Sequence, residues 1–130
     1  MPQRYYSATA QDTTINGNIN SSVTSIILSA AVGYPSNYPF VLALDYNAAS
    51  EELVLVTAKT AATTFTVTRG YNSTNPQAHR TGAVERHVIS AQDMTDMQAH
   101  FDATSNVHGV SGTIAALDDV TGIAFLTMGA

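Results

Sequence analysis

The stretch FVLALDYNAASEELVLVTAKTAATTFTVTRG, residues 40–70, decides the fold of this 130-residue chain. Its first two apolar runs flank the turn-prone NAAS and are rich in Val and Leu. In the third run Phe65 and Val67 alternate with threonines, which is the period-two pattern of a half-buried strand. We therefore predict three successive β-strands, at 40–46, 52–59 and 64–70.

Weaker β patterns lie on both sides of this stretch. TTINGNI (13–19) and TSIILSA (24–30) precede it, and GAVERHVIS (82–90) follows it. Five or six short strands at this spacing favour a small antiparallel barrel or sandwich. We expect residues 1–90 to form one mainly β module.

The period changes after residue 90. Ser90 is suited to cap a helix, and Asp93 lies three residues further on, at the positive end of that helix. Apolar residues then recur in one narrow stripe with helical spacing, at Met94, Met97 and Phe101. We predict a helix over 91–103. A single stripe cannot form its own core, so this helix must pack on the β module or on copies of itself.

The final segment, residues 104–130, is rich in Gly, Ser and Thr and has scattered apolar residues. The helical stripe continues into it at heptad spacing, through Thr104 to His108, which favours a threefold seam between copies. The segment lacks the apolar density for a core but is too apolar for a solvated linker. We expect an extended C-terminal arm that neighbouring subunits order.

Composition excludes several classes of protein. The net charge is −5 and the five basic residues do not cluster, which argues against nucleic-acid binding. There is no cysteine, so neither disulfides nor thiolate metal sites are expected. No signal peptide begins the sequence, and no apolar run approaches the roughly 20 residues that span a bilayer. We expect no membrane insertion, and a protein that is either intracellular or assembled inside a cell and released with something larger.

The loop TRGYNSTNPQAH, residues 68–79, is the main candidate for a site. Strand alternation places Arg69 on the same face as the apolar residues before it, where a guanidinium needs an acidic partner. Gly70 supplies a backbone conformation closed to other residues. We expect a structural corner held by an ion pair rather than a catalytic arginine, with three candidate partners, Glu52, Glu51 and Asp45.

The histidines and acids do not predict a metal site or an enzyme. No HxH, HxxxH or HExxH spacing occurs, so we expect His79 to bond backbone groups of its loop instead. Glu51 and Glu52 would point to opposite faces of a strand, and a flexible arm would hold Asp118-Asp119 poorly. No catalytic residue, cofactor or metal is predicted. Exposed tyrosines such as Tyr5, Tyr6 and Tyr71 leave a sugar-binding surface as an alternative.

The order of motifs over residues 24–95 resembles a β-rich module common in structural proteins of tailed bacteriophages. In that module a strand ending in T-R-G is followed by a Gly/Thr loop, A-H and G-A-x-V. The matching positions are Thr68, Arg69, Gly70, Thr74, Ala78, His79, Gly82, Ala83 and Val84, with Glu52 at the acidic residue that opens the earlier strand. Asn72-Ser73 departs from the pattern, which has an acidic residue and glycine there. ATSNVHGVSG (103–112) resembles the start of a trimeric phage fibre shaft.

The resemblance implies a non-enzymatic virion protein, assembled in the host cytoplasm. It would be a homotrimeric minor tail or fibre-base protein, or a capsid decoration or head-fibre protein. Its partners would be its own copies and other phage capsid or tail proteins. The alternative is a receptor-binding module for a host surface glycan. The expected structural-loop residues are Glu52, Arg69, Gly70, His79 and Gly82, and the expected oligomerisation residues are Met94, Met97, Phe101 and His108.

Overall fold

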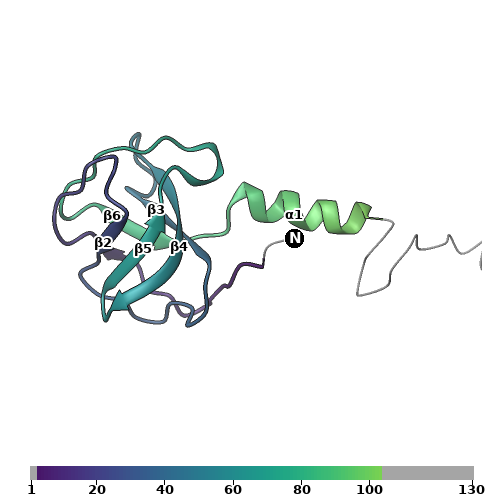
Figure 1. The fold of residues 1–130 in the computed structure, drawn as a ribbon, viewed down its shortest axis with the longest axis horizontal. Coiled ribbons are helices and arrows are strands. Elements are labelled where there is room, and N and C mark those ends of the chain that lie inside the picture. The colour runs from purple at the N-terminus through teal and green to yellow at the C-terminus, as the bar shows by residue number, and fades with distance from the viewer. Residues whose placement is uncertain (1–2, 104–130) are drawn as a thin grey trace, which may run out of the picture. The chain divides into compact units, whose positions relative to one another are not determined.

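The chain is mainly β, as predicted, in a computed structural model that describes residues 3–103. Its six strands all fall on the predicted β runs (Figure 1). They are β1 (Thr13–Thr14), β2 (Ser25–Ile27), β3 (Phe40–Leu44), β4 (Glu52–Ala61), β5 (Thr64–Thr68) and β6 (Val84–His87). A short 3₁₀ turn, η1 (Tyr71–Ser73), follows β5, and one helix, α1 (Ala91–Asp102), follows β6.

The six strands form one antiparallel sheet in the order β1-β6-β3-β4-β5-β2. The sheet curls so that its first and last strands meet: Ile15, just after β1, bridges Leu28, just after β2. Two further backbone hydrogen bonds of 2.8 Å, from Asn16 to Ile27 and from Ser29 to Thr14, support this closure. Of the two architectures expected from the sequence, the single curled sheet therefore makes this module barrel-like rather than a two-sheet sandwich.

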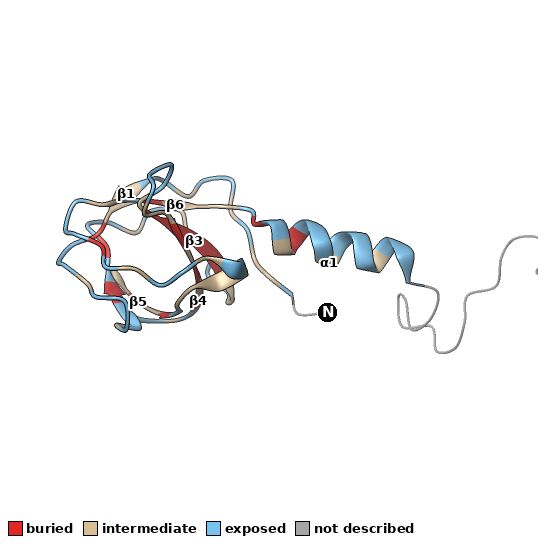
Figure 2. Cartoon of the chain, turned by 90° about the horizontal axis from the view of Figure 1, so that it is seen from above, coloured by how far each residue is buried: buried red, intermediate tan, exposed pale blue. Residues whose placement is uncertain are grey.

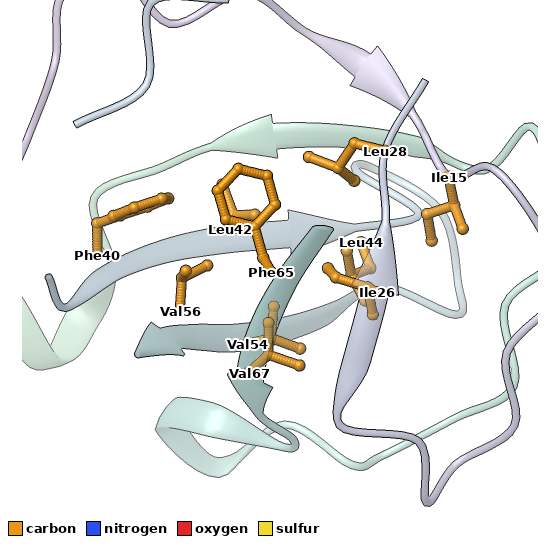
Figure 3. Close-up of a cluster of buried hydrophobic side chains, with 10 residues drawn as sticks. All are labelled: Ile15, Ile26, Leu28, Phe40, Leu42, Leu44, Val54, Val56, Phe65 and Val67. Atoms are coloured by element: carbon orange, nitrogen blue, oxygen red, sulfur yellow. The ribbon is translucent and has the colours of Figure 1, made fainter. Parts of the chain in front are cut away.

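The interior of the curled sheet holds the hydrophobic core, drawn in Figure 3. In β4 and β5 buried residues alternate with half-buried ones, as the sequence pattern predicts. All five residues of strand β3 are buried, and the strand is red in Figure 2. The core residues are Ile15, Ile26, Leu28, Phe40, Leu42, Leu44, Val54, Val56, Phe65 and Val67.

The chain divides into two compact units, one ending at Asp93 and the next beginning at Met94. Helix α1 begins in the first unit, directly after Ser90. The buried Asp93 carboxylate accepts hydrogen bonds from the Ser90 amide, at 2.7 Å, and the Ser90 hydroxyl, at 3.0 Å. Asp93 thus fulfils the expected acidic part of the capping box.

Beyond Asp93, most of α1 is exposed (Figure 2). Its apolar stripe is exposed too: the exposed fraction of the residue is 57% for Met94, 49% for Met97 and 72% for Phe101. Within residues 3–103, no helix is long and apolar enough to cross a membrane. Thr104, His108 and the expected arm, residues 104–130, lie outside the described residues.

Candidate functional site

The TRG corner, defined as Glu52, Arg69, Gly70 and His79, brings together three parts of the chain. Glu52 opens β4 and faces inward because it alternates with buried valines. Arg69 and Gly70 directly follow β5. His79 is held by a backbone bridge to Ile19, with both hydrogen bonds at 2.9 Å. The corner therefore fixes the long loop between β5 and β6 against the opening of β4.

The Arg69 guanidinium uses all five of its hydrogen-bond donors inside the module. It forms a two-pronged pair with Glu52, at 2.8 Å from Nε and 2.7 Å from Nη2. Nη1 donates to the carbonyls of Asn20, at 2.7 Å, and Val23, at 2.8 Å. The second Nη2 donor reaches the Gln77 carbonyl at 2.5 Å. Among the three acids expected as partners, Glu52 is the one paired, and no Arg69 donor is left for a ligand.

The Glu52 carboxylate is fully buried and accepts five hydrogen bonds. Besides Arg69, its donors are the amides of Gly70, at 2.9 Å, and Gln77, at 3.0 Å, and the His79 ring. Burial alone would raise the pKa of Glu52, but hydrogen bonds led by that from Arg69 outweigh it and hold the pKa at about 2. The carboxylate is therefore ionised throughout the physiological range.

The His79 ring bonds two carboxylates, and this corrects the expectation that it bonds backbone groups. Its Nε2 lies 2.8 Å from Glu52 and its Nδ1 lies 2.7 Å from Asp45. Only the backbone of His79 pairs with backbone. Because the ionised Glu52 carboxylate can only accept, the His79 Nε2 carries the hydrogen of that contact. The His79 ring thus joins the Arg69–Glu52 ion pair and the half-buried Asp45 into one hydrogen-bonded cluster.

Gly70 is fixed by backbone geometry. Its φ is +62°, in the left-handed region, and a Cβ built there would lie 2.8 Å from Pro76 and 2.9 Å from the Thr74 carbonyl. Gly82 also has a positive φ, +89°, but a Cβ there would meet open space. Gly82 lies in the turn before β6, outside the charged cluster, where its amide donates 2.8 Å to the Ile15 carbonyl. Of the five loop residues predicted from the sequence, four share the corner and Gly82 does not.

Two residues of the 3₁₀ turn after Gly70, Asn72 and Ser73, adopt an uncommon conformation. Asn72 has a φ of 54° and Ser73 a φ of 66°, so both are left-handed without being glycine. Such residues are tolerated only where their surroundings hold them. Here Thr74, directly after them, fixes the turn by donating its hydroxyl to the Tyr71 carbonyl at 2.8 Å.

Glu85 is a buried acid that the sequence reasoning missed. It is fully buried on β6, and its Oε1 has no hydrogen-bond partner among the described residues. Its Oε2 lies 2.5 Å from the Tyr34 hydroxyl, which is also 2.9 Å from the Gln11 carbonyl. A phenol has one hydrogen and the carbonyl can only accept, so the carboxyl supplies the hydrogen between Glu85 and Tyr34. Burial accordingly raises the pKa of Glu85 to about 8.

A second cluster missed from the sequence ties the N-terminal segment to the start of α1. The Asp93 carboxylate forms an ion pair with Arg4, both side chains being more than nine-tenths buried. It also accepts the Tyr6 hydroxyl at 2.6 Å. Burial works against ionisation, but hydrogen bonds from Tyr6, Ser90 and Arg4 keep the pKa of Asp93 below its usual value. Asp93 therefore links the two ends of the β module.

The tyrosines considered for sugar binding do not all present open rings. Tyr5 and Tyr71 are half-buried, whereas Tyr6 is 50% exposed. The Tyr6 hydroxyl is already bonded to Asp93. Among residues 3–103, no group of three or more His, Cys, Asp or Glu side chains is arranged to hold a metal ion.

No protein-family model matches the chain, and no curated protein matches it.

Proposed function

We propose that the chain is a non-enzymatic structural component of a bacteriophage virion, a homotrimer that docks through its β module and trimerises through its helix and arm. It would serve as a minor tail or fibre-base protein, or as a capsid decoration or head-fibre protein, assembled in the host cytoplasm. The observation that carries the proposal is the exposed apolar stripe Met94, Met97 and Phe101 on α1.

The stripe has the spacing of a coiled-coil seam. Met94, Met97 and Phe101 take a, d and a positions of a heptad, and His108, outside the described residues, takes the next a position. The acids Asp96 and Asp102 fall at c and b, away from such a seam. Three parallel copies would therefore join their apolar side chains without bringing these carboxylates together.

The energy of this seam indicates that the helix does not act alone. Full burial of an apolar side chain contributes about 1.5–3 kcal/mol, and these three are already partly covered, so each chain gains roughly 3–5 kcal/mol. Association costs about 4–15 kcal/mol in lost translational and rotational freedom. A seam this short is marginal, which supports a contribution from the arm.

The TRG corner supports a structural rather than a catalytic role. The motif residues that resemble the phage module consume one another's hydrogen-bonding groups, and every Arg69 donor is engaged. A catalytic arginine needs a donor directed at its substrate. In this proposal the corner keeps the module rigid while its outer surface docks on other virion proteins.

The test is the mass of the purified full-length chain by light scattering over a range of concentrations. We expect three times 13.7 kDa, about 41 kDa. Met97→Ser, in the seam, should shift the mass toward the monomer, whereas Ala99→Ser, at an outward f position of the same helix, should not. A monomer at high concentration would contradict the proposal. The virion assignment is tested separately, by searching purified phage particles for this chain with mass spectrometry.

A further inference from the structure

The β module carries a groove of about 820 Å³ on the outer side of β3 and β4. Ala43 and Leu53, which pair across these two strands, lie in its lining. The N-terminal segment contributes Tyr6, and the segment before α1 contributes Ile89, which is 68% exposed. The surface of the groove is mainly apolar. It differs from the TRG corner, none of whose four residues lines it.

The ionisable groups in the groove are already hydrogen bonded within the module. The His87 ring donates from Nδ1 to the Val41 carbonyl at 2.9 Å, and its Nε2 accepts the Ser7 amide at 3.2 Å. The Glu51 carboxylate accepts the Asn47 amide at 2.6 Å.

Three of the hydroxyls in the groove are engaged as well. Ser90 and Tyr6 both bond the Asp93 carboxylate. Ser7 donates its hydroxyl to the Gly33 carbonyl. A sugar needs several directed hydrogen bonds, and few groups here remain to make them. The groove therefore fits an apolar segment better than a glycan.

The chain itself has an apolar segment of this kind. Residues 120–130, VTGIAFLTMGA, carry no charge and include Ile123, Phe125 and Leu126. The groove ends at Ala91, where α1 begins, and the 12-residue helix rises about 18 Å. The twenty residues from 103 to 123 span up to about 66 Å when extended, so chain length allows residues 123–126 to return to a groove.

We propose that the groove of each β module receives residues 123–126 of a neighbouring copy. This inference rests on the proposed trimer and assigns the arm its binding site. This binding would couple the copies, because the arm of one copy would hold the module of the next. The copies could then separate only if the helical seam or the groove opened. The N-terminal segment, which lines the groove through Tyr6 and Ala8, would then form part of the interface.

The absence of cysteine from the full chain allows a clean cross-linking test. A tagged chain with Ala8→Cys, in the groove, is co-expressed with an untagged chain carrying Ala124→Cys, and the pair is mildly oxidised. We expect a disulfide-linked product of the two chains. Adding Ile89→Asp to the tagged chain should reduce its yield at least tenfold. Thr60→Cys, exposed on β4 and outside the groove, is the matched control and should give little product.

The outcomes separate this inference from the proposed function. A trimer by light scattering with no product, or with equal product from Thr60→Cys, would overturn the groove assignment and leave the trimer standing. A monomer would overturn both. A chain carrying Ala8→Cys and Ala124→Cys together should link between copies, and linkage only within one chain would show that each arm binds its own module. A glycan that protects the Ala8→Cys thiol from alkylation would also refute the assignment.

Discussion

Replacing Glu85 with glutamine should make the β module more stable at neutral pH. Glu85 is fully buried, and its geometry with Tyr34 requires the carboxyl to hold its proton. A glutamine amide can donate to the Tyr34 oxygen in the same way but never ionises. The substitution therefore keeps the shape and the hydrogen bond and removes the cost of holding a proton.

The size of the effect follows from the pKa, which burial raises from 4.5 to about 8. Below pH 4.5 the folded and unfolded chains both hold the proton, and Glu85 carries no penalty. Between the two values only the unfolded chain releases it, so stability falls by about 1.4 kcal/mol per pH unit. The loss is about 3 kcal/mol at pH 7 and about 5 kcal/mol above pH 8. Glutamine leaves one additional N–H without a partner, at about 1 kcal/mol, so the net gain at pH 7 is about 2 kcal/mol.

The assay is urea unfolding of the two proteins from pH 5 to pH 8.5. The difference between their free energies of unfolding should widen toward alkaline pH in favour of Glu85→Gln. Glu51→Gln makes the same chemical change at a half-buried carboxylate and serves as the matched control. If the curves of the wild type and Glu85→Gln run parallel across this range, Glu85 is ionised in the folded protein and the assignment of its proton is wrong.

Three further substitutions test the other contacts, each by denaturant unfolding. Arg69→Ala leaves the Glu52 carboxylate buried without its main partner and should lower the free energy of unfolding by about 3–5 kcal/mol. Arg86→Ala breaks an exposed pair and should change stability little. Equal effects of the two substitutions would show that the buried ion pair assigned to Arg69 is wrong. Gly70→Ala should cost more than Gly82→Ala, because both have positive φ but only Gly70 also meets Pro76, and the reverse order would contradict the packing. Asp93→Ala should cost about 3 kcal/mol, since it removes a helix cap and a buried ion pair, and an unchanged midpoint would argue against both contacts.

The fold could be predicted because its signals are local. Alternation in TFTVT places Phe65 and Val67 inside and the threonines outside, and the strand does so. The ion pair of Arg69 was also within reach, because a guanidinium on the core side of a strand needs a nearby carboxylate. The alternation of β6 offered a similar signal for Glu85, whose neighbour Val84 is exposed.

The contacts that could not be predicted join segments far apart in sequence. The His79 ring meets Asp45, 34 residues earlier, only because the curled sheet brings their loops together. Arg4 and Asp93 are 89 residues apart and meet at the base of the helix. A sequence pattern within one segment predicts on which face of its strand or helix a residue lies, but it does not predict which residue of another segment lies opposite.

The bridge between Ile15 and Leu28 bears on how copies of this chain can be crowded together. An open sheet presents a row of unpaired amides and carbonyls to which another chain can add a strand. Here part of each edge is already paired, because the Thr14 carbonyl of β1 accepts the Ser29 amide and the Ile27 carbonyl of β2 accepts the Asn16 amide. Another chain could add a strand at this point only by first breaking the bonds that close the sheet.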